Sequence, residues 1–255
     1  MSGERLDGTV ALVTGASSGI GAATAQQLAA RGATVAVAAR RVDRLDDLVA
    51  TIAATGGRAV AFECDIAARG AAAELVARTV GKLGRLDTLV NNAGLMLLGP
   101  IVGADVEDWE RMLSVNVEGL LACAHAALPH LLDAAVDSPR RVADMVNISS
   151  TAGRFPRVGV GAYNLTKHGI GAFSEALRQE VTERHVRVSL IEPGAVDTEL
   201  TTHLSPTALE GFQQRFGGVE RLTADDVADT ITFVVTRPRR VAINEILVRP
   251  TEQQV

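Results

Sequence analysis

Short apolar runs alternate with helical patterns along nearly the whole chain. Most of the runs are rich in β-branched residues and apolar on both faces, which is typical of parallel strands covered by helices. The predicted strands are 10–14, 34–39, 59–64, 86–91, 143–149, 186–192 and 245–249. The predicted helices are 19–31, 43–54, 70–83, 106–132, 161–184 and 224–236. Strands that alternate with helices predict an α/β fold built from right-handed βαβ units.

This rhythm predicts a Rossmann-type, doubly wound sheet of seven parallel strands with helices on both faces. No linker or break in composition divides the chain, so we expect a single domain over 1–255. Two segments depart from the rhythm. Segment 134–141 is expected to be a polar loop. The longer segment 199–221 is expected to be either a lid or binding loop for substrate, or a surface excursion with its own short helix.

The composition excludes several classes of protein. Apolar residues make up 47% of the 255 positions and the net charge is −5, which is not the composition of a disordered chain. No run of 18 or more apolar residues occurs, so no membrane span is expected. The first residues lack the basic and apolar regions of a secretory signal. We therefore expect a cytoplasmic protein.

Charge and metal-ligand patterns exclude two kinds of partner. The acidic balance argues against nucleic acid, and the basic segments 140–141 and 237–240 are expected to be solvated surface. Cys64 and Cys123 are far apart in the chain, and no histidine pair has the spacing of metal ligands. We expect two buried thiols and no metal site.

A glycine-rich loop follows the first predicted strand and opens the first predicted helix. Gly15 permits the sharp turn, while Gly19 and Gly21 allow the backbone to approach a pyrophosphate. Unpaired N–H groups at the start of the helix then face the anion. The pattern therefore predicts a dinucleotide site. The other predicted cofactor contacts in this loop are Ser17, Ser18 and Ile20.

Two arginines stand where an acidic residue would favour NAD. Ala39 occupies that place, about 20 positions after the glycines, and Arg40 and Arg41 follow it. A guanidinium is suited to a 2′-phosphate, so we expect NADP(H). Asp65, after the third strand, either accepts the adenine amino group or forms a simple strand-end turn. Ile66 beside it is a further predicted cofactor contact.

The chain's only tyrosine lies in a pattern that predicts acid–base chemistry. Tyr163 and Lys167 are four residues apart and share one face of a predicted helix. A nearby ammonium favours the phenolate, so Lys167 is expected to lower the pKa of Tyr163. Ser150, at the carboxyl end of the fifth strand, is placed to hold a substrate oxygen beside the Tyr163 hydroxyl.

With these segments, the sequence resembles the short-chain dehydrogenase/reductase family over essentially its whole length. The matching segments are TGASSGIG (14–21), NNAG (91–94), Asn116, NISS (147–150), YNLTK (163–167) and PGAVDT (193–198). A narrower resemblance, to NADPH-dependent clavulanate (clavaldehyde) dehydrogenase-like reductases, comes from segments 91–100, 127–132, 174–188, 191–200 and 245–253.

The family resemblance implies a catalytic tetrad of Asn116, Ser150, Tyr163 and Lys167. Tyr163 would be the acid or base for the substrate oxygen, and Ser150 would orient that oxygen. Lys167 would also bind the nicotinamide ribose, and Asn116 would support a water-linked proton relay. The remaining implied cofactor contacts are Asn92, Ala93 and Gly94 near the adenosine ribose, and Pro193, Gly194, Val196 and Thr198 around the nicotinamide.

Substrate contacts are expected from loops at the carboxyl edge of the sheet. Met96, Phe155 and Leu200 would form a mainly apolar cleft beside Ser150. Arg154 and Arg157 either pair with a substrate carboxylate or are solvated.

The leading expectation is an NADP(H)-dependent oxidoreductase that reduces an aldehyde or ketone, or oxidises the alcohol. The alternatives are a regulator that senses NADP without turnover, and a lyase or epimerase on the same scaffold. Tyr163 and Lys167 favour an enzyme. The resemblance also implies a homodimer or homotetramer built on helices 106–132 and 161–184, where Ile170 and Leu177 face either another subunit or the core.

Overall fold

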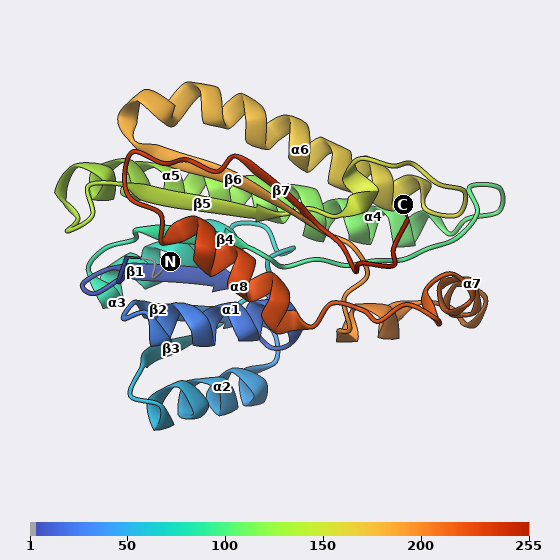
Figure 1. Cartoon of the computed structure of the whole chain (residues 1–255), viewed down its shortest axis with the longest axis horizontal. Coiled ribbons are helices and arrows are strands. Elements are labelled where there is room, and N and C mark those ends of the chain that lie inside the picture. Colours follow the sequence, from blue (N-terminus) through green and yellow to red (C-terminus); the bar gives the residue numbers. More distant parts are fainter. Residues whose placement is uncertain (1–3, 255) are drawn as a thin grey trace.

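Seven parallel strands form one sheet in the computed structural model, which describes residues 4–254 (Figure 1). Residues 1–3 and 255 of the predicted domain lie outside the described residues. The strand order is β3-β2-β1-β4-β5-β6-β7. The strands are β1 (Val10–Thr14), β2 (Thr34–Ala39), β3 (Arg58–Glu63), β4 (Thr88–Asn91), β5 (Ala143–Ile148), β6 (Val186–Pro193) and β7 (Glu245–Val248). The order reverses between β1 and β4, and open α/β sheets bind ligands at the carboxyl ends beside such a reversal.

Eight α-helices and four shorter helical segments connect the strands within the described residues. The α-helices are α1 (Gly19–Ala30), α2 (Val42–Ala54), α3 (Ala71–Leu83), α4 (Val106–Leu113), α5 (Gly119–Asp137), α6 (Gly161–Val181), α7 (Pro206–Phe216) and α8 (Ala224–Val235). The shorter segments are the π-helical η1 (Ser114–Glu118) and the 3₁₀ segments η2 (Thr151–Gly153), η3 (Thr182–Arg184) and η4 (Glu199–His203).

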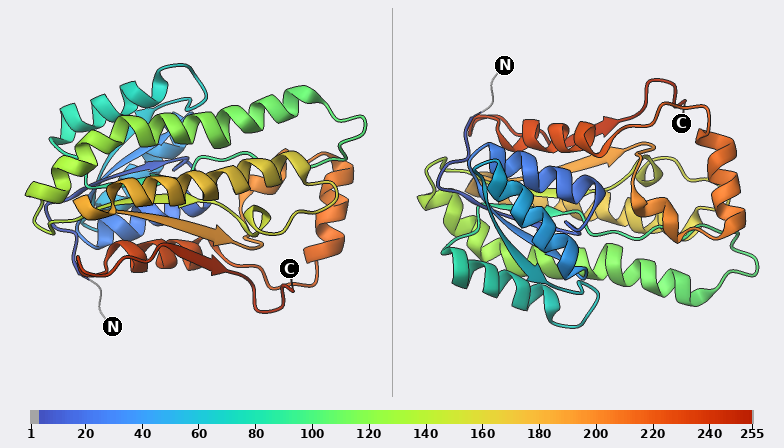
Figure 2. Two further views of the ribbon diagram at one scale, coloured as in Figure 1. Left: turned by 90° about the horizontal axis from the view of Figure 1, so that it is seen from above. Right: turned by 90° about the horizontal axis from the view of Figure 1, so that it is seen from below.

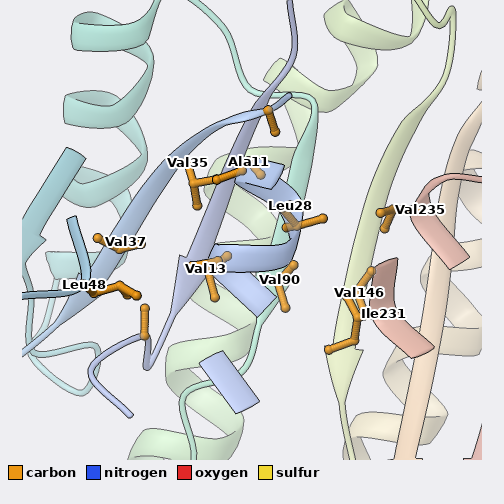
Figure 3. Close-up of a cluster of buried hydrophobic side chains, with 14 of the residues drawn as sticks. Ala11, Val13, Leu28, Val35, Val37, Leu48, Val90, Val146, Ile231 and Val235 are labelled. Carbon is orange, nitrogen blue, oxygen red and sulfur yellow. The ribbon is translucent and has the colours of Figure 1, made fainter. Parts of the chain in front are cut away.

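The helices cover both faces of the sheet, because successive strand residues point to opposite faces. On one face, Leu28 of α1, Leu48 of α2 and Ile231 of α8 pack on alternate strand residues such as Val13 (Figure 3). On the other face, α3, α5 and α6 cover Leu12 and its neighbours. Figure 2 shows the two helical layers from opposite sides. The sheet is therefore doubly wound, as predicted.

The predicted element boundaries agree with the structure except in one segment. Each strand begins and ends within two residues of its prediction. Segment 134–141, predicted as a polar loop, is helical as far as Asp137, so that prediction was wrong for its first half. The helix is extended by tertiary contacts, since Asp137 pairs with Arg85 at 3.1 Å and Ala134 and Ala135 are buried.

The helical stretch Val106–Asp137 is long and apolar enough to cross a membrane, judged by length and composition alone. Its inner side contains Cys123, Ala127 and Leu131, which are completely buried among residues of the sheet and of α3. This is the packing of a core helix.

A buried ion cluster joins β5 and β6 to the segment after α8. The Asp144 carboxylate, 1% exposed, accepts hydrogen bonds from Arg187 at 2.7 and 3.0 Å and from Arg140 at 3.3 Å. Both guanidinium groups also donate to the carbonyl oxygens of Val235 and Arg237. The expectation that segment 140–141 is solvated is therefore wrong for Arg140, whose side chain is 7% exposed.

Asp144→Ala is expected to lower the free energy of unfolding by about 3–5 kcal/mol, because it leaves the buried Arg187 guanidinium without its carboxylate and removes one partner of Arg140. Urea denaturation measures the change. The matched control is Asp108→Ala, which removes an exposed pair with Arg111 and should cost less than about 1 kcal/mol. Equal losses in the two variants would show that the buried cluster is not a stabilising element.

Candidate active site

A cavity of about 1100 Å³ lies along the carboxyl ends of the strands. The glycine loop, Arg40 and Asp65 line one end, and residues of α7 line the other. Ser150, Tyr163 and Lys167 line it as well. Figure 2 shows α7 lying across the end of the molecule toward which β6 and β7 point. The cavity is large enough for a dinucleotide together with a small substrate.

The glycine loop packs so closely on its neighbours that a side chain would not fit at two of its glycines. Gly15 has φ +66°, and a Cβ there would lie 2.8 Å from Ala93 Cα. A Cβ on Gly21 would lie 2.5 Å from both Asn92 Nδ2 and Gly15 O. Within the described chain, no side chain caps the N-terminus of α1 and no acidic residue lies in its first turn. The start of α1 is therefore open to an anion such as a pyrophosphate.

Asn92 holds this loop in place. Its Nδ2 donates to Thr14 O at 2.9 Å and to Gly15 O at 3.2 Å. The Thr14 hydroxyl in turn accepts hydrogen bonds from the backbone N–H groups of Asn92 and Ala93, both at 3.1 Å. Asn92, Ala93 and Gly94 line the cavity, and their contact with the adenosine ribose stays a prediction; Thr14 is a supporting residue that the sequence did not single out.

The basic end of the cavity is built around Arg41. Its guanidinium donates to the hydroxyls of Ser17 and Ser18 at 2.9–3.2 Å and pairs with Glu199 at 2.8 Å. Arg40 lines the same end of the cavity and is exposed. A ligand phosphate can replace the Arg41–Glu199 pair, because both side chains remain more than 40% exposed.

The other predicted cofactor contacts also line the cavity. Asp65 does so while its Oδ1 accepts a hydrogen bond from Ala67 N at 3.1 Å, so it also forms the strand-end turn that was the alternative prediction. Thr198 is the N-cap of η4 and lies beside Gly19 of the glycine loop. The remaining cavity-lining residues of this group are Ile20, Ile66, Pro193, Gly194 and Val196.

Tyr163, Ser150 and Lys167 lie close together in the cavity at the carboxyl edge of the sheet. Tyr163, on α6, is 6% exposed, and its hydroxyl is hydrogen-bonded to the Ser150 hydroxyl. Lys167, one turn further along α6, donates from Nζ to Ile148 O at 2.8 Å. Its Nζ lies 5.7 Å from the centre of the Tyr163 ring.

The electrostatics of this group differ from the sequence prediction. Burial raises the pKa of Tyr163 to about 12, and the hydrogen bond with Ser150 only partly opposes that rise. Burial also lowers the pKa of Lys167 to about 8. The prediction that Lys167 lowers the pKa of Tyr163 is therefore wrong for the protein without ligand, because desolvation disfavours both charged forms. At neutral pH, Tyr163 carries its proton.

Lys167→Met is expected to change how protein stability depends on pH. The unfolded chain holds the lysine proton up to about pH 10.5 and the folded protein only up to about pH 8, so charging Lys167 costs stability below pH 8. We expect the variant to gain stability relative to the wild type at pH 7, with up to about 3 kcal/mol of that relative gain lost by pH 10.5. Urea denaturation of both proteins at several pH values isolates this difference from the titration of the thiols and Tyr163. A difference that does not vary with pH would contradict the burial of a charged Lys167.

Asn116 lies on η1 and is 1% exposed. Its Oδ1 accepts from Leu95 N at 2.7 Å, and its Nδ2 donates to Leu95 O at 2.8 Å and Thr166 Oγ1 at 3.3 Å. Asn116 therefore fixes the segment after β4, and it is not among the residues that line the cavity. Its role in a proton relay remains a prediction.

The expected substrate contacts divide into two groups. Met96 and Leu200 line the cavity, and both belong to one apolar cluster with Tyr163. Phe155 is not among the cavity-lining residues. Segment 199–221 consists largely of η4 and α7 and also lines the cavity, so it carries its own helix and borders the site as well.

Among the described residues, no cluster of histidine, cysteine and acidic side chains is arranged to hold a metal ion.

Fold and site together define a class, a dinucleotide-binding α/β enzyme with a tyrosine–lysine pair at the carboxyl edge of its sheet. The family model described as short chain dehydrogenase matches residues 9–209. The chain belongs to the short-chain dehydrogenase/reductase family, and it is an NADP-dependent enzyme of that family.

Individual relatives extend this match over the whole chain. Serine 3-dehydrogenase of Rhizobium radiobacter is 36% identical over 249 residues, which cover 97% of this chain and 96% of that protein. Glycine betaine reductase ATRR of Emericella nidulans is 36% identical over 251 residues, but these residues cover only 19% of that longer protein.

Several similar solved structures contain NADP, and two of them show the extent of the match. The closed form of serine dehydrogenase complexed with NADP+ superposes with a TM-score of 0.86 at 33% identity, with 97% of each chain covered. A metagenomic short-chain oxidoreductase in complex with NADP has a TM-score of 0.80 at 33% identity and covers 96% of this chain and 99% of its own. The prediction that the cofactor is NADP(H) is confirmed, whereas the roles of Arg40 and Arg41 in binding it stay predictions.

Proposed function

We propose that the protein reduces an aldehyde or ketone to an alcohol, or catalyses the reverse reaction, with Tyr163 as the acid or base. The observation that carries this proposal is the position of Tyr163 beside Ser150 and Lys167, in the cavity whose far end holds the glycine loop and Arg41. A phenol held in this way can donate a proton to an oxygen that develops negative charge.

A nicotinamide bound in the cavity would supply or accept the hydride. Tyr163 gives its proton to the substrate oxygen, and the Ser150 hydroxyl holds that oxygen in place. The ammonium of Lys167 stabilises the phenolate that remains, since a cation near an ion in a buried site interacts strongly with it. We propose that Lys167 also binds the ribose beside the nicotinamide, and that Asn116 positions the loop through Leu95.

The neutral state of Tyr163 suits the direction of reduction, because the proton is in place before the reaction starts. Oxidation of an alcohol needs the phenolate instead, and the high pKa of Tyr163 makes this form rare at neutral pH. We therefore infer that carbonyl reduction is favoured at neutral pH and that alcohol oxidation accelerates as the pH rises.

A panel of carbonyl compounds, assayed with NADPH and NADH in parallel, tests the proposal. The panel contains acidic aldehydes, acetoacetyl thioesters, cyclic ketones and clavaldehyde, which the narrower resemblance suggests as a substrate. L-serine with NADP+ serves as the oxidation arm, because a relative is named for that activity. We expect NADPH oxidation with at least one carbonyl compound. Failure of every compound to oxidise NADPH would contradict the proposal.

We further infer a cytoplasmic homodimer or homotetramer. Large apolar side chains remain exposed on the long helices, among them Leu121 of α5 and Leu165 of α6, and they supply the surface for such a contact. Ile170 and Leu177, which the sequence left open as subunit contacts, are buried within the chain at 2% and 8% exposure and belong to its core.

A further inference from the structure

Arg157 lines the proposed substrate cavity and has a side-chain nitrogen that is unpaired within the described chain. It lies on the loop between η2 and α6 and lines the cavity together with Val158 and Val160. Its Nη2 atom is buried and has no hydrogen-bond partner among the described residues. A buried donor without a partner costs free energy, and more so when the group is charged. The guanidinium therefore has donor capacity that no protein group uses at Nη2.

The nearby Arg154 differs from Arg157 because its guanidinium is paired with carboxylates. The Arg154 guanidinium donates to Glu192 at 2.6 Å and also pairs with Glu245, so two carboxylates satisfy it. Arg154 is not among the cavity-lining residues. Of the two arginines that the sequence singles out, only Arg157 faces the site with donor capacity left over.

Further positive charge surrounds Arg157. Burial lowers the pKa of Arg157, and the charges of Arg215 on α7 and of Arg249 after β7 lower it further. Arg215 also lines the cavity, and neither it nor Arg249 forms an ion pair within the described part of the chain. Arg249 donates to Gln254 O at 3.0 Å, and the Arg215 guanidinium lies over the Phe216 ring.

The acidic residues of the cavity do not neutralise this group. Glu199 pairs with Arg41, and Asp65 belongs to the adenosine end. Glu110, on α4, is exposed and forms no ion pair with Arg157. Glu252, which lines a smaller neighbouring cavity with Arg215, accepts a hydrogen bond from Glu220 N at 3.2 Å.

The position of Arg157 is tied to that of the reacting tyrosine. Asn164, which follows Tyr163 on α6, accepts a hydrogen bond from Arg157 N at 3.2 Å through its Oδ1. Its Nδ2 donates to Ala152 O at 2.6 Å and Phe155 O at 3.3 Å. The Asn164 side chain thus holds the Arg157 loop at a set place relative to Tyr163.

We propose that Arg157, supported by Arg215, binds an anionic group of the substrate, either a carboxylate or a phosphate monoester, while the carbonyl oxygen lies at Tyr163. This inference rests on the proposed function and narrows its substrates to carbonyl compounds that carry such a group. A guanidinium is suited to both anions, because its planar donors match their paired oxygens.

Two matched pairs of substrates test the proposal with NADPH. Succinic semialdehyde is compared with its methyl ester, and glyceraldehyde 3-phosphate is compared with glyceraldehyde, so that the two pairs distinguish a carboxylate from a phosphate. Arg157→Ala is expected to lower kcat/KM for the preferred anionic substrate about 30-fold, mainly through KM, with the neutral partner changed less than about 3-fold. Arg157→Lys should recover part of the loss, and Arg240→Ala, an exposed arginine after α8, should have no effect.

Equal losses for the anionic and neutral substrates in both pairs would overturn the subsite and leave the proposed function standing. If no carbonyl compound turns over, the proposed function fails instead, and calorimetry then tests the subsite directly. Succinate or inorganic phosphate, but not succinamide, should bind to the NADP+-loaded protein, and Arg157→Ala should weaken that binding about 30-fold. Binding that Arg157→Ala leaves unchanged would overturn the subsite.

Discussion

Tyr163→Phe should lower kcat about 10³-fold while the affinity for NADPH stays within about 3-fold of the wild type. The variant removes one oxygen atom and keeps the ring, which is packed with Met96 and Leu200. The substrate oxygen then loses both its proton donor and one hydrogen bond. Stopped-flow absorbance of the reduced cofactor measures turnover, and quenching of fluorescence measures NADPH binding.

The Tyr163→Phe result is informative because the chain has a single tyrosine. No other phenol of the chain can donate the proton in its place, and the phenol titration of the folded protein can be assigned to Tyr163. A matched control is Thr207→Val, a cavity-lining substitution on α7 that removes a hydroxyl from a residue with no proposed chemical role. Near-full activity in Tyr163→Phe would remove Tyr163 from the reaction.

The double variant Arg40→Ala/Arg41→Ala should lower kcat/KM for NADPH by about 10³-fold and change kcat/KM for NADH by less than about 5-fold. Each guanidinium is expected to supply charge-assisted hydrogen bonds to a 2′-phosphate, which NADH lacks. Arg41 is already held at the mouth of the glycine loop by Ser17 and Ser18, so little ordering is needed when the phosphate binds.

Arg58→Ala is the control for this double variant. Arg58 is an exposed arginine at the amino end of β3, away from the carboxyl edge, and its removal should affect neither cofactor. Equal losses for NADPH and NADH in the double variant would mean that the two arginines support the fold of the loop rather than recognise the phosphate.

The strands were predictable because their signal is local. Strands such as β1 and β2 are buried along almost their whole length, so a short run of apolar residues marks each of them with little ambiguity. The glycine loop was equally predictable from the sequence, since Gly15 and Gly21 stand where a Cβ would collide with the backbone or with Asn92.

Features that depend on residues far away in the sequence could not be predicted in the same way. Arg154 and Arg157 are three residues apart and alike in sequence. Only the folded chain brings Glu192 of β6 and Glu245 of β7 to Arg154, and among the described residues it leaves Arg157 Nη2 without a partner. The end of α5 is a second case, because Asp137 and Arg140 look like loop residues until Arg85 and Asp144 pair with them.

The prediction of a lowered pKa for Tyr163 failed for a related reason. The i, i+4 spacing correctly places Lys167 near Tyr163, but spacing carries no information about burial. Desolvation opposes the phenolate and the ammonium alike, and in the protein without ligand it dominates the pKa of both groups.

Transfer of deuterium tests the central claim most directly. The protein is incubated with a carbonyl substrate and NADPH labelled with deuterium at the transferred position of C4, and the product is analysed by mass spectrometry. We expect an alcohol with one deuterium on the carbon that carried the carbonyl group, and one NADP+ formed for each alcohol. Substrate conversion without oxidation of NADPH, as in a lyase or epimerase, or tight NADPH binding without turnover of any substrate, as in a regulator, would contradict it.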